Sequence, residues 1–491
     1  MSSFKKRSRT VLGGLPLLLG AGIGIGISGC NWTKFSNEAD RAPVRSIGSP
    51  SGFDSSDFGR SLIPLSTGQG SAAAFVATGF NGSHLVLVEI DAGGGVTSSA
   101  VSTTAFSETE SSAVSSLVEV PGSTPTRLLL GSPTVRDKDF GRVYTFQLAD
   151  AAASGVGDAP VTTLQIPMLG TMDSGLGRGL ATGFVSGVAT TPDFIIGGDN
   201  DLAVVVDGNP ATAVVANVPV PVTAPGIGDP CEVAYEHTQD QRYQAHRPLA
   251  AASLWNDPSG LQQILVGATH SGTPGKVGIM AVSGTTLTCL ASITGGPLQS
   301  QFGRSFAVGN FMGDADGVAD DLAIGVPPKQ VIVYPGWSKL PVGTIPTPLS
   351  PIVSDRGGDF GFSMTALHVD GISADVLFVG DPRATVGDKA FAGHVLGFQY
   401  DPGTNAMIPL AGPLAEIADH SPEGDANFGS TVNALNFCRT DPALLAGGPC
   451  PAADLSRLLL VGAANEVFVY FRVGSNIPIP AGQTVPDVRT P

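Results

Sequence analysis

Short apolar runs, separated by turns rich in Gly, Pro and Asp, recur along most of this 491-residue chain. The pattern is clearest in residues 301–336, where 305–308, 322–324 and Gln330–Tyr334 are apolar and the intervening residues are turn formers. This alternation predicts three short antiparallel strands joined as a meander. Such a unit cannot bury both of its faces alone, so we expect it to recur.

The same order of elements does recur, with decay, at intervals of roughly 60 residues. The second predicted strand of most units is a run of apolar residues ending on Gly, as in 128–131 and 194–197. Another β-rich stretch follows most third strands, as in 161–166 and 286–293, so each unit is predicted to have four strands. The seven units begin near Phe58, Phe106, Gly175, Arg247, Phe302, Phe360 and Phe428.

These repeats resemble the FG-GAP repeat of integrin-α-type β-propellers. The resemblance rests on Phe302-Gly303, the acidic turn after it, the segment LAIGVP and the strand VIVYPG, and it extends from about Asp57 to about Gly474. It implies an all-β fold, a seven-bladed β-propeller of four-stranded antiparallel blades. It also implies that a strand at 44–47 closes the last blade, which removes an exposed sheet edge. Six or eight blades are the alternatives if a degenerate unit is misread.

The repeated residues have structural reasons to be there. A Phe at the start of a blade can pack between neighbouring sheets, and the Gly beside it lets the backbone pass closely. The apolar second strand suits a position flanked by two other blades. The motif is therefore mainly a folding device.

Composition agrees with an all-β chain. The chain has 65 Gly and 38 Pro, 42% hydrophobic residues and only 14% charged residues, and beyond the N-terminus no long segment has helical periodicity. The formal net charge is −16. Because such an acidic surface repels phosphate backbones, we expect no nucleic-acid partner, and we expect a soluble monomeric domain.

The N-terminus resembles the signal of a bacterial lipoprotein. Residues 1–10 carry basic side chains, 11–29 are uncharged and largely apolar, and Cys30 follows small residues. We expect a signal peptide at 1–29, a lipidated Cys30 with a tether to residue 50, the propeller at 51–474, and a Pro-rich strand or tail at 475–491. This organisation places the protein at the bacterial cell envelope, on the outer membrane or cell surface. The alternatives are an ordinary signal and an uncleaved anchor.

Four further cysteines suggest two disulfides outside the cytoplasm. Cys438 and Cys450 share one hydrophilic insertion and are the local pair that we expect, which leaves Cys231 with Cys289. The alternative is free buried thiols, and the sequence does not determine the connectivity.

Calcium is the one cofactor that the resemblance suggests, since relatives bind it between the first and second strands of some blades. Carboxylate and carbonyl oxygens at alternate positions suit Ca²⁺. In the fifth unit the matching ligands are Asp314, Asp316, the carbonyl of Val318, and Asp320, although Met312 stands where another ligand belongs. The sixth unit retains Asp370 and Asp375, and the third retains Asp193. The alternative interpretation is an Asp/Gly-rich turn.

The sequence contains no zinc-type histidine pair, no nucleophile elbow and no phosphate-binding loop. We therefore expect a recognition or adhesion scaffold that binds a protein or glycan. We expect insertions such as 135–140, 219–245 and 437–455 to contact the partner. The alternatives are an extracellular polysaccharide lyase or hydrolase of propeller type and a structural envelope component.

Overall fold

A computed structural model of the chain divides it into residues 1–40 and residues 41–491, and all described residues belong to the second unit. The predicted signal peptide, Cys30, the tail 475–491 and most of the three insertions therefore lie outside the described residues. The structure describes residues 44–49, 58–59, 61–65, 71–78, 84–91, 95–102, 116–121, 126–132, 142–148, 162–164, 177–187, 192–198, 201–206, 218–219, 248–256, 259–269, 274–284, 286–314, 316–369, 372–411, 414–419, 426–438 and 455–470.

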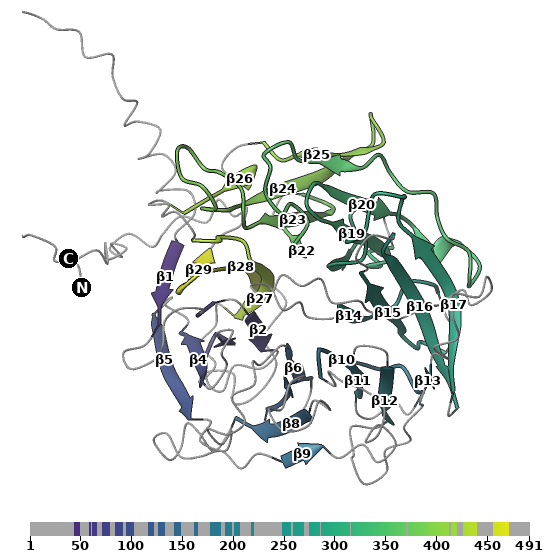
Figure 1. Ribbon diagram of the computed structural model, residues 1–491, viewed down its shortest axis with the longest axis horizontal. Helices are drawn as coiled ribbons and strands as arrows, with labels where there is room; N and C mark the ends of the chain where they lie inside the picture. The colour runs from purple at the N-terminus through teal and green to yellow at the C-terminus, as the bar shows by residue number, and fades with distance from the viewer. Residues whose placement is uncertain are drawn as a thin grey trace, which may run out of the picture. The chain divides into compact units, whose positions relative to one another are not determined.

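The described strands form seven antiparallel sheets, which follow one another around a ring (Figure 1). We number these blades in chain order. Blade one contains β2 (Ser61–Leu65), β3 (Ala73–Thr78), β4 (His84–Ile90) and β5 (Val96–Ser102). Blade two contains β6 (Ser116–Val120), β7 (Arg127–Ser132), β8 (Arg142–Gln147) and β9 (Thr162–Leu164). Blade three contains β10 (Gly179–Gly183), β11 (Asp193–Gly197), β12 (Asp201–Val205) and β13 (Val218–Pro219).

The remaining blades repeat this order. Blade four contains β14 (Leu249–Ala252), β15 (Gln263–Ala268), β16 (Lys276–Ser283) and β17 (Thr286–Thr294). Blade five contains β18 (Phe306–Gly309), β19 (Asp321–Val326), β20 (Gln330–Tyr334) and β21 (Ile352–Val353). Blade six contains β22 (Ser363–His368), β23 (Asp375–Asp381), β24 (His394–Asp401), β25 (Ala406–Pro409) and β26 (Glu416–Ile417). The all-β, seven-bladed propeller is thus confirmed.

Blade seven is built from both ends of the propeller. It contains β27 (Thr431–Cys438), β28 (Leu455–Ala463) and β29 (Glu466–Tyr470), and β1 (Val44–Gly48) supplies its fourth strand. β1 pairs antiparallel with β29, from Val44 opposite Tyr470 to Gly48 opposite Glu466. The predicted closure by an N-terminal strand is confirmed, and it covers the edge that β29 would otherwise expose.

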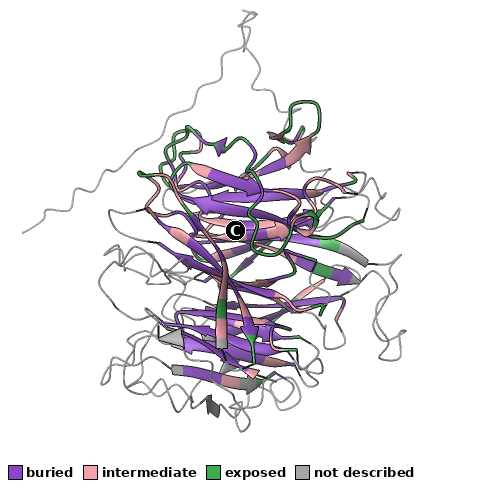
Figure 2. Ribbon diagram, turned by 90° about the vertical axis from the view of Figure 1, so that its right-hand side faces the viewer, coloured by how far each residue is buried: buried purple, intermediate pink, exposed green. Residues whose placement is uncertain are grey.

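Apolar side chains fill every seam between blades. Within the described residues, seven buried clusters each join two neighbouring blades, and the cluster between blades seven and one completes the ring. The motif residues Phe302, Phe360 and Phe428 have no exposed surface and belong to these clusters, which confirms their predicted packing between sheets. Figure 2 shows buried residues along the strands and exposed residues mainly in the connecting loops.

Blade six departs from the predicted four strands. After β25 the chain returns, and β26 pairs with the start of β24 through Ile417 opposite Val395. The extra strand arises because β25 pairs only with the distal half of β24, from Phe398 to Asp401, which leaves the proximal half open to a second partner. No helix within the described part of the chain has the length and hydropathy needed to cross a membrane.

Candidate functional site

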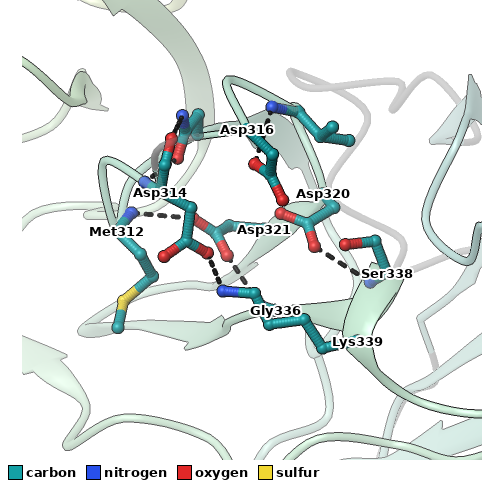
Figure 3. A network of polar contacts seen from close by, with 10 residues as sticks. Met312, Asp314, Asp316, Asp320, Asp321, Gly336, Ser338 and Lys339 are labelled. Carbon is teal, nitrogen blue, oxygen red and sulfur yellow. Dashed lines mark hydrogen bonds and ion pairs between the residues drawn. The ribbon is translucent and has the colours of Figure 1, made fainter.

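The acidic residues of blade five lie in the loop between β18 and β19, as the sequence predicts (Figure 3). The loop is shaped by its own side chains. Asn310 Oδ1 accepts a hydrogen bond from the Asp314 backbone N–H at 2.9 Å, and Asp316 Oδ1 accepts one from the Val318 N–H at 3.1 Å. The Val318 carbonyl accepts a hydrogen bond from the Asp320 N–H at 3.1 Å. The bond from Asp316 to the N–H two residues further on is typical of an Asx turn.

A lysine from the next loop enters this cluster. Lys339 ends the single-turn 3₁₀ helix Trp337–Lys339, which follows β20, and its Nζ forms an ion pair with the Asp314 carboxylate (Figure 3). The hydrogen bond with Asp314, together with the negative charges of Asp320 and Asp316, raises the pKa of Lys339 above its ordinary value. The ammonium group is therefore the positive charge that balances the acidic loop.

Asp320 and Asp321 are both buried, at 1% and 0% exposure. Asp321 accepts hydrogen bonds from the Met312 N–H at 2.8 Å and from the Gly336 N–H at 2.7 Å, so it joins two loops. Asp320 Oδ2 accepts one from the Ser338 N–H at 2.9 Å, and its Oδ1 has no hydrogen-bond partner in the described part of the chain. Burial raises the pKa of Asp321 to about 6, because an ionised carboxylate is poorly solvated there.

The arrangement does not fit a calcium ion as it stands. The three predicted carboxylates are directed to different partners, namely Lys339, the Val318 N–H and the Ser338 N–H, rather than to one point. Among the described residues no group of three or more His, Cys, Asp or Glu side chains could hold a metal. Calcium binding therefore stays a prediction, and it would require the Lys339 ammonium to leave Asp314. In blade six, Asp370 lies outside the described residues.

In several blades, the side chain at the start of the second strand accepts hydrogen bonds from the backbone of the loop that precedes it. In blade three, Asp193 accepts hydrogen bonds from the Val185 and Ser186 N–H groups at 2.9 and 2.8 Å. In blade four, Gln263 Oε1 accepts one from the Leu254 N–H at 2.8 Å. We call Asp193, Gln263 and Asp321 the loop-anchoring residues, because each begins its second strand and binds the backbone of the preceding loop.

Sequence reasoning identified Asp193 only as a remnant metal ligand and missed Gln263. The signal that could have found both is positional, since each loop-anchoring residue lies four residues before the Gly that ends the apolar run of its blade. Asp375 begins the second strand of blade six and instead reaches across the seam, where its Oδ2 accepts a hydrogen bond from the Asn310 N–H of blade five at 2.9 Å.

A pocket of about 470 Å³ opens between the anchored loops of blades three and four. Its two walls are joined by a reciprocal pair of hydrogen bonds, in which the Phe184 N–H donates to Gln262 Oε1 and the Gln262 N–H donates to the Phe184 carbonyl, both at 2.9 Å. Its lining residues are Phe184, Gly187, Ser253, Ser259, Gly260, Leu261 and Gln262. The pocket lies at the same end of its blades as the acidic loop of blade five, since all three loops connect first and second strands.

A second polar cluster, at blade six, surrounds a buried histidine. His394 has 0% exposure; its Nδ1 lies 3.0 Å from Glu416 Oε1 and its Nε2 lies 3.5 Å from the buried Asp381 carboxylate. Arg356 binds Glu416 with both guanidinium nitrogens, one at 2.8 Å. Burial raises the pKa of Glu416, but hydrogen bonds from Arg356 and His394 outweigh it, so the pKa lies below its ordinary value. The imidazole has no exposed surface, and it lies between the carboxylates of Asp381 on β23 and Glu416 on β26.

The predicted disulfides fall largely outside the described residues. Cys289, on β17, is disulfide-bonded. Its pairing with Cys231 stays a prediction, because Cys231 is not described. Cys438 ends β27, but its side chain is not described, and Cys450 lies in an undescribed segment.

Comparison with known proteins gives only a fold-level likeness. No known protein family matches this sequence, and no curated protein matches it. The crystal structure of Saccharomyces cerevisiae Sqt1 is similar with a TM-score of 0.45 and 12% identity, over 84% of this chain and 84% of that one. A protein from Lactobacillus plantarum is similar with a TM-score of 0.42 and 10% identity, over 78% of this chain and 98% of that one. No functional argument rests on likenesses this distant, and the propeller architecture stands on the strand pairing of this chain.

Proposed function

We propose that this chain is a lipid-anchored protein of the bacterial cell envelope whose propeller serves as a recognition scaffold for a protein or glycan partner. The observation that carries the proposal is the preformed pocket between blades three and four, where both walls are held in place by buried side chains. Binding sites are commonly carried by loops that a rigid scaffold positions.

The scaffold supports this use because buried side chains bind the backbone of both loops that form the pocket. Asp193 and Gln263 are 1% and 2% exposed and bind the backbones of the two loops that form the pocket. A surface that is ordered before binding loses less conformational entropy when a partner binds. This favours recognition of a partner by the existing surface over folding around it.

The anchoring part of the proposal rests on the resemblance of residues 11–30 to a lipoprotein signal. Its test is metabolic labelling of a bacterial host that expresses the full chain, using a clickable fatty acid. Labelled protein in the membrane fraction is the expected result. Loss of both label and membrane association in Cys30→Ser, with both retained in Cys289→Ser as the matched control, supports lipidation at Cys30. Equal labelling of wild type and Cys30→Ser refutes it.

The recognition part is tested with the full chain extracted from membranes in mild detergent. The purified protein is immobilised and exposed to isolated envelope polysaccharides and envelope proteins, with calcium and again with a chelator. A saturable partner that is lost when Ser253→Trp fills the pocket supports recognition at this surface. Depolymerisation of a polysaccharide without a stable complex supports the lyase or hydrolase alternative. If neither a partner nor depolymerisation is found, the structural role is favoured.

A further inference from the structure

We infer that the pocket between blades three and four binds one neutral pyranose residue of a glycan. This inference rests on the proposed recognition function and names its ligand. The pocket volume of about 470 Å³ lies within the range of small-ligand sites, roughly 300–1,000 Å³. The open mouth suits a sugar that is one residue of a longer chain.

The first argument is charge. The chain has a formal net charge of −16, yet the described residues that line the pocket are all uncharged. The described lining residues offer no positive charge that would attract phosphates, sulfates or carboxylates. Recognition by these residues relies on apolar contact and neutral hydrogen bonds, which favours an uncharged polar ligand.

The second argument is the mixture of surfaces. Phe184 is 41% exposed, so part of its ring is available to the pocket that it lines. The axial C–H bonds of a pyranose carry partial positive charge and pack well against the negative face of an aromatic ring. Gln262 and Ser253 add neutral amide and hydroxyl groups, which can both donate to and accept from sugar hydroxyls. An aromatic surface beside such groups matches the alternating apolar and polar faces of a sugar ring.

The third argument is preorganisation. Gly187 and Gly260 have positive φ, at +82° and +71°. Any side chain at either position would strain the backbone, so both loops depend on glycine for their conformation beside the pocket. The wall carrying Phe184 is held at the neighbouring Val185 and Ser186 N–H groups. The aromatic surface is therefore in place before a ligand arrives, which favours binding.

The test uses the full chain in mild detergent. The probes are methyl glycosides of neutral hexoses and N-acetylhexosamines, with methyl glucuronide as the charged comparison, measured by saturation-transfer difference NMR and calorimetry. We expect at least one neutral glycoside to bind with a Kd of roughly millimolar order. We expect Phe184→Ala to weaken it by roughly tenfold and Phe184→Tyr to retain it.

Two further variants separate binding at this pocket from general effects of substitution. Phe391→Ala removes a phenylalanine of similar exposure, 43%, from another blade and should leave binding unchanged. Ser253→Trp fills the pocket from an exposed position, so it should abolish binding without lowering the melting temperature. Binding of the glucuronide alone, or equal losses in Phe184→Ala and Phe391→Ala, overturns the inference.

The failure of this inference is distinguishable from the failure of the proposed function. Suppose that no neutral glycoside binds, but that an envelope protein is captured and Ser253→Trp abolishes the capture. The sugar ligand is then refuted, and the proposed recognition function is supported. If no partner is captured and polysaccharide is cleaved, both are refuted.

Discussion

Ser363 Oγ of blade six donates a hydrogen bond to the carbonyl oxygen of Gly429 in blade seven at 2.8 Å. The relationship recurs around the ring. Ser305 Oγ donates to the Gly361 carbonyl at 2.7 Å, and Ser116 Oγ donates to the Gly177 carbonyl at 2.6 Å. In each case a serine at the start of one blade binds the backbone that opens the next blade, so these bonds set the spacing between neighbouring sheets.

Removing one of these hydroxyl groups should weaken one seam. We expect Ser363→Ala to lower the free energy of unfolding by about 1 kcal/mol, since it deletes a partly buried hydrogen bond and leaves the Gly429 carbonyl with one donor fewer. Urea denaturation followed by tryptophan fluorescence measures the change. Ser430→Ala is the matched control, because Ser430 Oγ makes a longer bond of 3.3 Å within its own blade. An equal or larger loss in the control would contradict this assignment.

In blade six, the glycine near the end of the second strand faces the same carbonyl group. A Cβ on Gly380 would lie 2.2 Å from the Gly429 carbonyl oxygen and 2.4 Å from Ser363 Oγ. We expect Gly380→Ala to cost at least about 2 kcal/mol of unfolding free energy, because blades six and seven would have to separate to admit the methyl group. Thermal denaturation tests this. Gly48→Ala, on β1, should be neutral, since a Cβ there meets nothing within 4 Å. Similar melting temperatures for both variants would refute the steric argument.

Asp321 should make the stability of the protein depend on pH. Its pKa is about 6 in the folded state, raised mainly by burial, against about 3.9 in an unfolded chain. Protonated Asp321 therefore stabilises the fold fully below about pH 4, and this contribution, about 3 kcal/mol, is lost as pH rises through 6. We expect urea midpoints of the wild type to fall over this range more than those of Asp321→Asn.

The control for Asp321 comes from the same loop. Asp316 is exposed, so Asp316→Asn should keep the pH dependence of the wild type. Parallel pH profiles of the wild type and Asp321→Asn would show that Asp321 does not titrate in this range.

Lys339 should suppress calcium binding by the acidic loop. We expect Lys339→Gln to melt at a lower temperature than the wild type in chelator, because the charges of Asp314, Asp316 and Asp320 then repel one another uncompensated. Added Ca²⁺ should raise the melting temperature of this variant more than that of the wild type, since carboxylates released from the lysine are calcium ligands.

Lys389→Gln is the matched control for Lys339. Lys389 is an exposed lysine 3.7 Å from Asp388, away from the acidic loop, so its loss should leave the calcium response of the wild type unchanged. A calcium response of the wild type as large as that of Lys339→Gln would mean that the lysine does not compete with the ion. That result would instead support the calcium site that the resemblance implies.

Most of the architecture could be predicted from the sequence, because strands and turns are encoded locally. The predicted strand at 44–47 lies in β1, and the apolar run from Leu322 lies in β19. Alternating apolar residues and Gly-containing turns favour the same local structure in every copy, so seven degenerate repeats still indicate seven blades. The extra strand β26 could not be found in this way, because only the short reach of β25 leaves it a partner.

The candidate sites depended on the tertiary structure. The sequence placed Asp314 and Asp320 in one loop, but Lys339 is 25 residues from Asp314, and Gln262 is 78 residues from Phe184. No periodicity connects these pairs, since strand pairing within blade five brings Lys339 to Asp314, and packing of blade three against blade four brings Gln262 to Phe184. The sequence by itself therefore determined the repeat, the strands and the closure of the ring. Only the tertiary structure decided which acidic side chains have partners and where a pocket opens, because those contacts form between segments that the local pattern leaves independent.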